Sequence, residues 1–174
     1  MVNHGMGYYE RWFRKGYSNV PGVDSCAPFQ IDKYRAQEIA YGHAGFIGNV
    51  ATGNVQWVAK EHNLMHPVQR LYGTAKATRI EYDVDGRMVP GSIALAVNRR
   101  DRQWITYDSG LQLWINWSAE PWPREGYVLP QWGFLAKGPQ TEVWTAQTKA
   151  GMADMARCPE YVFVDARTAF TMPY

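Results

Sequence analysis

The sequence has few cysteines, almost no net charge and no long apolar run. Its 174 residues include only two cysteines, Cys26 and Cys158, which lie far apart and in no C-x-x-C setting. A zinc cluster and a disulfide scaffold are therefore excluded, while the pairing of these two cysteines stays open. The 18 basic and 16 acidic side chains leave a formal charge of +2, so we expect no nucleic-acid partner.

The longest apolar run, Ile93 to Val97, is far shorter than the roughly 18 residues that a membrane helix needs. We therefore expect no membrane partner. The opening residues lack the basic start and apolar stretch of a secretory leader, and the localisation stays open. Aromatic side chains are abundant instead, with 8 Trp, 11 Tyr and 6 Phe beside 16 Gly and 10 Pro. This composition is typical of turn-rich β structure.

The first part of the chain, residues 1–75, reads as loop and helix. Asp32 is placed to cap a short helix that runs through Ile39 and stops at Gly42. A second helix is expected from an N-cap at Asn54 to Gly73, because its apolar residues fall on one helical stripe. Pro67 removes a backbone donor, so a kink or a break is expected near His66.

The second part, residues 76–174, changes to a period of two. Six candidate strands are separated mostly by turn motifs: Thr78–Asp83, Ser92–Val97, Gln103–Tyr107, Leu111–Trp117, Thr141–Lys149 and Tyr161–Asp165. The pattern predicts an α+β fold in which an antiparallel β-sandwich is packed by the N-terminal helices.

The segment from Gln103 to Trp117 predicts a β-hairpin whose register can be deduced. If residues 108–110 form a three-residue loop with Gly110 left-handed, Tyr107 pairs with Leu111 and Trp104 with Trp114. One face then carries the core residues Ile105, Tyr107, Leu111, Leu113, Ile115 and Trp117. The other face carries Trp104, Thr106, Gln112, Trp114 and Asn116.

Two tryptophans among hydrogen-bonding side chains are suited to a sugar ligand. The C–H face of a pyranose packs on an indole, while its hydroxyls bond nearby amides and hydroxyls. We therefore expect Trp104 and Trp114 to stack sugar rings and Gln112, Asn116 and Thr106 to bond hydroxyls. The alternative is that a helix or a loop covers this face and makes both tryptophans ordinary core.

Catalytic chemistry has weaker sequence support. Glycoside hydrolysis needs two carboxyl groups, one of them with a raised pKa, and the candidates are Asp24, Asp32, Glu38 and Glu61. His62 and His66 have the i, i+4 spacing of a zinc pair, but Asn63 stands where a zinc protease has its glutamate and Pro67 follows the second histidine. We expect no metal and no cofactor.

Two segments resemble a known family. His4-Gly5-Met6-Gly7-Tyr8-Tyr9 is followed by Tyr34-Arg35-Ala36-Gln37-Glu38-Ile39-Ala40-Tyr41-Gly42-His43-Ala44-Gly45-Phe46, then by a helix and a run of strands. This layout resembles the C-terminal region of bacterial TIM-barrel glycoside-hydrolase-like proteins, where the end of the barrel passes into a β-sandwich. The resemblance implies carbohydrate as the ligand class. A closed barrel needs about 200 residues or more, so it does not fit in this chain.

Three functions follow as expectations. The first is a carbohydrate-binding accessory region of a glycoside-hydrolase-type protein, with a polysaccharide or oligosaccharide as its partner. The second is an autonomous glycan-cleaving hydrolase that uses two of the four carboxylates. The third is a protein-interaction module whose exposed aromatics associate with another protein chain.

Overall fold

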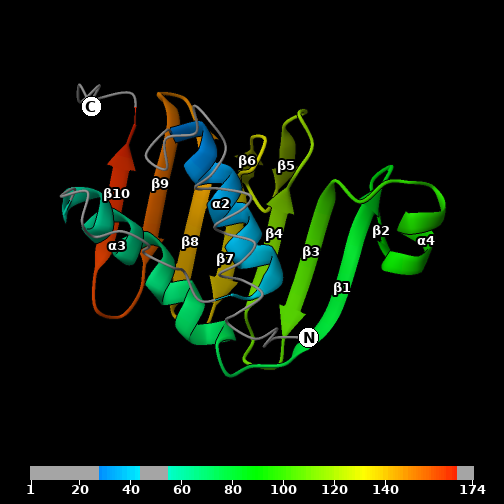
Figure 1. Cartoon of the computed structure of the whole chain (residues 1–174), viewed down its shortest axis with the longest axis horizontal. Helices are drawn as coiled ribbons and strands as arrows, with labels where there is room; N and C mark the ends of the chain where they lie inside the picture. The colour runs from blue at the N-terminus through cyan, green and yellow to red at the C-terminus, as the bar shows by residue number, and fades with distance from the viewer. Residues whose placement is uncertain (1–27, 44–54, 168–174) are drawn as a thin grey trace, which may run out of the picture.

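The computed structural model describes residues 28–43 and 55–167, which form an antiparallel sheet and three helices (Figure 1). The helices are α2 (Pro28–Tyr41), α3 (Val55–Tyr72) and the short α4 (Gly91–Ala96). The strands are β1 (Ala77–Val84), β2 (Arg87–Pro90), β3 (Arg102–Tyr107), β4 (Gln112–Asn116), β5 (Trp122–Arg124), β6 (Tyr127–Leu129), β7 (Phe134–Gly138), β8 (Thr141–Thr148), β9 (Gly151–Arg157) and β10 (Val162–Ala166).

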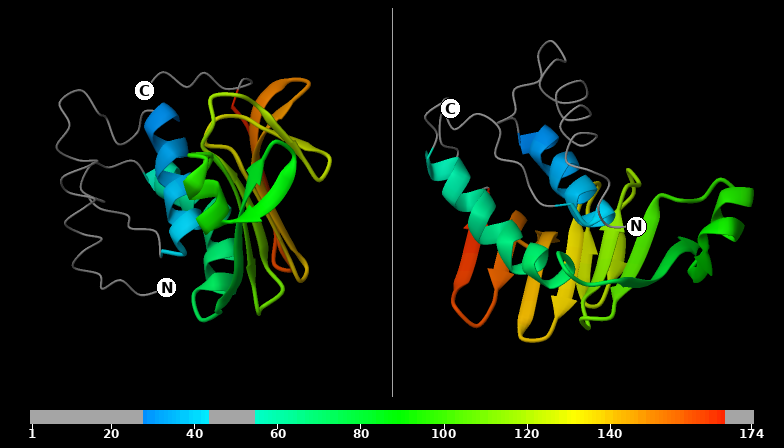
Figure 2. Two further views of the ribbon diagram at one scale, coloured as in Figure 1. Left: turned by 90° about the vertical axis from the view of Figure 1, so that its right-hand side faces the viewer. Right: turned by 60° about the horizontal axis from the view of Figure 1, so that its bottom comes forward.

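The strands form one curled sheet. Eight of them lie in the order β10-β9-β8-β7-β4-β3-β1-β2, and the β5–β6 hairpin joins this sheet through a pairing of β6 with β8. The helices α2 and α3 lie on one face, and the sheet curls around them as a half-barrel (Figure 2). The expected β-rich architecture with helical packing is confirmed. The strands do not separate clearly into the two sheets of a sandwich.

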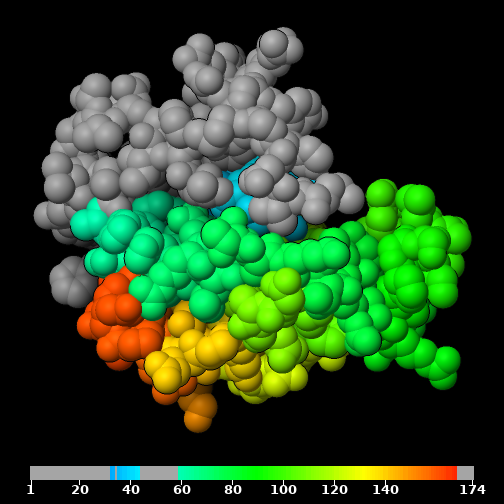
Figure 3. Space-filling model, turned by 90° about the horizontal axis from the view of Figure 1, so that it is seen from below, coloured from blue at the N-terminus to red at the C-terminus, as the bar shows by residue number. Residues whose placement is uncertain are grey.

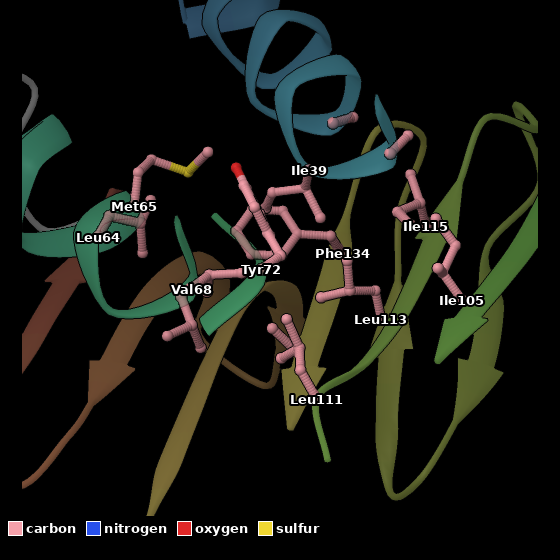
Figure 4. Packing of buried hydrophobic residues seen from close by; sticks show 14 of the residues in the cluster. Ile39, Leu64, Met65, Val68, Tyr72, Ile105, Leu111, Leu113, Ile115 and Phe134 are labelled. Atoms are coloured by element: carbon pink, nitrogen blue, oxygen red, sulfur yellow. The ribbon is translucent and has the colours of Figure 1, made fainter. Parts of the chain in front are cut away.

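The core lies between the helices and the inner face of the sheet (Figure 4). Strand register places one apolar row across the sheet, namely Ile105, Leu113, Ala136, Val143 and Ala156. The helices contribute Ala36, Ile39, Leu64, Met65, Val68 and Tyr72, all buried. Burying a large apolar side chain contributes about 1.5–3 kcal/mol, so this layer is the main stabilising contact.

The helix ends follow the sequence in part. Gly42 has a φ of 65° and the N–H of His43 donates to the carbonyl oxygen of Glu38 at 3.0 Å, which makes Gly42 the predicted C-terminal stop. The start differs, because α2 begins at Pro28 and Asp32 lies within the helix. Proline is favoured in the first turn, where its missing N–H costs nothing. The expected break in α3 does not occur, since one helix continues past Pro67 to Tyr72.

The β3–β4 hairpin has the predicted register. Trp104 pairs with Trp114, and Tyr107 donates its N–H to the carbonyl oxygen of Leu111 at 2.9 Å. Gly110 has a φ of 82°, as the three-residue loop requires. The predicted core face is confirmed: all its members are buried except Trp117, which is partly buried and packs against the core.

The segment Ser92–Val97 was expected to be a strand and forms α4 instead. Its residues are nearly all apolar or small, and such a short run does not distinguish a strand from a helix. Only Ala94 is buried, and Arg99 donates its N–H to the carbonyl oxygen of Ala94 at 2.9 Å. The lobe that contains β1, β2 and α4 projects from the body of the molecule (Figure 3).

Candidate functional site

The outer face of the sheet, opposite α2 and α3, carries two rows of side chains. The aromatic row follows the strand pairing and consists of Glu81, Trp104, Trp114, Leu135, Trp144 and Met155. The polar row lies beside it and consists of Arg79, Thr106, Gln112, Lys137, Glu142 and Arg157. Because paired residues share a face, each row crosses six neighbouring strands from β1 to β9.

Trp104 lies between a ring and a cation. Its ring stacks on that of Trp114, with centroids 6.3 Å apart and planes at 17°. The guanidinium of Arg79 lies 5.5 Å from the centroid of Trp104. Since β3 lies between β1 and β4, Arg79 and Trp114 approach the indole from opposite sides. The Trp104 ring therefore has both an aromatic and a cationic neighbour.

The β5–β6 hairpin covers the other end of this face. Trp122 and Leu129 pack with Trp114, Leu135 and Ala146 in a second apolar cluster. A buried carboxylate fixes the hairpin to β1, because Asp83 Oδ2 accepts from Trp122 Nε1 at 2.9 Å and from a guanidinium nitrogen of Arg124.

Two of the predicted ligand-binding residues are structural. Trp114 is 7% exposed beneath the hairpin, and Asn116 is fully buried. The amide nitrogen of Asn116 donates to the carbonyl oxygens of Glu120, Leu129 and Pro130 at 2.9–3.1 Å. Neither side chain is available to a ligand. This corrects the expectation that Trp114 stacks a sugar and that Asn116 bonds its hydroxyls.

The remaining predicted ligand-binding residues lie beside two cations that the sequence analysis did not single out. Gln112 is exposed, and Thr106 is half-buried with its hydroxyl 2.9 Å from that of Thr78. On one side of this pair lies Arg79, and on the other side lies Lys137, whose Nζ is 5.7 Å from the ring centroid of Tyr127. Arg79 lies opposite Thr106 because a β-bulge between Ala77 and Arg79 shifts the register of β1, and no register for this strand was derived from the sequence.

Tyr127 and Glu142 contact each other in the β8 part of the polar row. The Tyr127 hydroxyl donates to Glu142 Oε1, and Arg157 donates to Glu142 Oε2 at 3.3 Å. Burial, followed by the hydrogen bond to the Glu142 carboxylate, raises the pKa of Tyr127 to about 12. The phenol is therefore a neutral hydrogen-bond donor at neutral pH.

The predicted catalytic carboxylates lie on the helical side of the sheet. Glu61 accepts from Arg35 Nε at 2.8 Å, and Asp32 accepts from Arg167 at 2.7 Å. Arg167 also bonds Asp154, which accepts the Thr145 hydroxyl at 2.7 Å and is fully buried. The structure thus brings Asp32 and Glu61 into one ionic cluster with Asp154. Glu38 is buried elsewhere on α2, and Asp24 lies outside the described residues.

The ionic cluster favours the ionised form of Asp154. Burial opposes the ionisation of Asp154, but the charge of Arg35 and the hydrogen bonds from Arg167 outweigh it and lower its pKa. Arg35 has a raised pKa because Glu61 and Asp154 overcome its own desolvation. A glycosidase acid needs a carboxyl with a raised pKa. This arrangement instead favours a structural role for the cluster.

The structure also describes the histidine pair and the residue types that bind metals. His62 and His66 stack on α3 with centroids 4.8 Å apart. Within residues 28–43 and 55–167, no group of three His, Cys, Asp or Glu side chains could hold a metal ion. In the same part of the chain, no helix is both long enough and apolar enough to cross a bilayer.

Comparison with known proteins gives no family assignment: no family model, no curated protein and no solved structure matches the chain.

Proposed function

We propose that the chain is a carbohydrate-binding accessory region of a glycoside-hydrolase-type protein, with the outer polar row as its contact surface. The observation that carries the proposal is the unbroken row of hydrogen-bonding side chains from Arg79 to Glu142, beside the rings of Trp104 and Tyr127. A linear glycan laid across the strands meets a donor or acceptor at each strand, and such side chains are what sugar hydroxyls need.

The fold supports this proposal in a second way. The β5–β6 hairpin is a partial second layer over the outer face, so we infer a β-sandwich type of module whose second sheet is reduced to two strands. The hairpin covers the Trp114 end of the face and leaves Gln112 exposed. The contact surface is therefore covered on one side and open on the other.

The test measures binding to a panel of soluble polysaccharides by affinity electrophoresis and by tryptophan fluorescence. Gln112→Ala should weaken the binding by about threefold to tenfold, the range of one or two neutral hydrogen bonds. Gln131→Ala removes an exposed glutamine outside the row and should change nothing. Failure of the wild-type chain to bind any member of the panel would overturn the proposal.

A hydrolase is the second candidate. Its carboxylate pair would be Asp32 and Glu61, which both contact Arg35, although their ionic partners favour a structural role. The same wells are assayed for new reducing ends. Turnover that is lost in Glu61→Gln, Glu38→Gln or Asp32→Asn variants with native circular dichroism would favour an enzyme. Binding without new ends would favour the accessory region.

A protein-interaction module is the third candidate, favoured by exposed apolar side chains at two places. On and beside α4 these are Ile93, Leu95 and Val97, and on β10 they are Val162 and Val164. Sedimentation at increasing protein concentration tests this candidate. A mass that rises with concentration, together with an absence of glycan binding, would favour it.

A further inference from the structure

We propose that the glycan bound by the outer face is acidic, with carboxylate or sulfate groups recognised by Arg79 and Lys137. This inference rests on the proposed function and names the class of its ligand. It comes from the way the cations of this face are paired and from their spacing along the polar row.

Arg79 occupies the place where a neutral sugar would stack. The Trp104 ring stacks on Trp114 with centroids 6.3 Å apart, and the guanidinium of Arg79 lies 5.5 Å from the centroid of the same ring. The Arg79 side chain is 57% exposed, and its ion pair with Glu81 is a long contact of 3.6 Å from Nε. The ring thus holds a guanidinium whose terminal N–H groups point to no described carboxylate, which suits bidentate binding of an anion.

Lys137 is the second weakly paired cation of the row. Its Nζ lies over Tyr127 and 3.5 Å from Glu125, a carboxylate that is itself half exposed. Three other cations of this face have partners: Arg124 binds the buried Asp83, Arg157 binds Glu142, and Arg102 donates to the carbonyl oxygen of Pro121 at 3.4 Å. Among the described cations of the polar row, Arg79 and Lys137 have the longest carboxylate contacts, at 3.6 and 3.5 Å, and we assign the anion to them.

The spacing of the two cations fits a hydroxylated chain between two anionic groups. Arg79, Thr106, Gln112 and Lys137 are consecutive partners on β1, β3, β4 and β7. Three interstrand steps place the two cations about 14 Å apart along the row. Thr106 and Gln112 lie between them, as hydrogen-bonding partners for sugar hydroxyls. An acidic oligosaccharide offers anionic groups to Arg79 and Lys137 and hydroxyls to Thr106 and Gln112. A neutral oligosaccharide offers no anionic group to either cation.

The experiment compares charged and neutral forms of the same backbone by affinity electrophoresis and calorimetry. The probes are polygalacturonate against its methyl ester, and dextran sulfate against dextran. In one or both pairs, we expect the charged glycan to bind at least tenfold more tightly than its neutral form. A difference in the polygalacturonate pair indicates recognition of carboxylate, and a difference in the dextran pair indicates recognition of sulfate. Arg79→Gln and Lys137→Gln should each weaken that binding by about tenfold, the effect of one charge-assisted hydrogen bond.

Arg87→Gln is the matched control, because it removes the same charge from β2, outside the polar row. It should change the affinity less than twofold. An equal loss in Arg87→Gln would show attraction to net charge and overturn the site. Equal binding of charged and neutral glycans would overturn the acidic specificity but leave the proposed function standing. Binding of neither kind would overturn both.

Discussion

At the scale of single residues, Asp154 joins the helices to the far end of the sheet. It is fully buried on β9 and bonds Thr145 on β8, Arg167 after β10 and, at 3.6 Å, Arg35 on α2. An isolated buried carboxylate would be very costly, so its partners determine whether the local structure is stable. Removing one charged side chain from such a cluster leaves its oppositely charged partners uncompensated in the interior.

Asp154→Asn should therefore lower the free energy of unfolding by about 3 kcal/mol, because Arg35 and Arg167 lose a buried counter-charge. Urea unfolding followed by circular dichroism measures this change. Glu160→Gln is the control, since it breaks an exposed pair with Arg70 and should move the midpoint little. A midpoint equally insensitive to both substitutions would contradict the role given to Asp154.

The same residue predicts a pH dependence. The folded-state pKa of Asp154 lies below its ordinary value of about 3.9, so the folded state binds this proton less readily than the unfolded state. Its contribution to stability is therefore present above about pH 4 and is lost as the pH falls through the folded pKa. Unfolding curves between pH 6 and 2.5 should show a smaller acid loss in Asp154→Asn than in the wild type.

The ionic cluster around Asp154 could not be predicted from the sequence. Sequence reasoning identified Asp32 and Glu61 as chemically interesting charged residues, and the structure brings both to Arg35. Their partner Asp154 is more than a hundred residues from Asp32, and nothing local in a sequence connects charges at that distance. The contact of Asp83 with Trp122 is equally hidden in the sequence, because the two residues are 39 positions apart.

At the scale of elements, the β5–β6 hairpin determines which outer-face side chains a ligand can reach. Its strands have only three residues each, so few backbone hydrogen bonds hold it. Asp83 supplies the missing attachment. Its Oδ2 accepts from Trp122 and Arg124, while its Oδ1 accepts from the N–H of Gly86 at 2.7 Å.

Asp83→Asn should loosen this hairpin, because both oxygens are acceptors and an amide NH2 in either place faces a donor. We expect a loss of about 2 kcal/mol, and faster hydrogen exchange in β5 and β6 than in β3 and β4. Asp85→Asn, in the same turn but exposed, is the control. Uniform acceleration of exchange over the whole sheet would show a global effect and contradict the local attachment.

The two hairpins show what sequence patterns can and cannot establish. The register of β3–β4 was predictable, because one short turn and strict alternation determine every pair. The β5–β6 hairpin was missed because its strands are short and Pro121 and Pro123 obscure the pattern. Consequently the sequence correctly placed Trp104, Thr106 and Gln112 on the outer face, but it did not show that Trp114 and Asn116 are covered.

At the scale of the whole molecule, the two edges of the sheet differ. The β2 edge is four residues long, carries Arg87 and ends at Pro90, features that discourage pairing with another strand. The β10 edge has five residues, and its outward side chains Val162 and Val164 are 66% and 63% exposed. Within residues 28–43 and 55–167, the β10 edge is therefore the more open to association between chains.

Val164→Lys should weaken self-association, because a charge on an edge strand opposes strand pairing. Light scattering measures the protein concentration at which the mass first exceeds that of a monomer. We expect the substitution to raise this concentration about threefold or more. Val97→Lys is the matched control, since Val97 is similarly exposed beside α4, away from the open edge. A stronger effect of Val97→Lys would place the self-association at the α4 lobe instead.

The stacking of Trp104 and Trp114 has an optical consequence. Two nearly parallel indoles with centroids 6.3 Å apart have coupled electronic transitions, so the folded chain should show an exciton couplet in its circular dichroism. The couplet requires the β3–β4 pairing and the position of both rings. An anion that draws Arg79 away from Trp104 would change the band without unfolding the sheet. The outer face therefore contains its own spectroscopic reporter, which needs no attached dye.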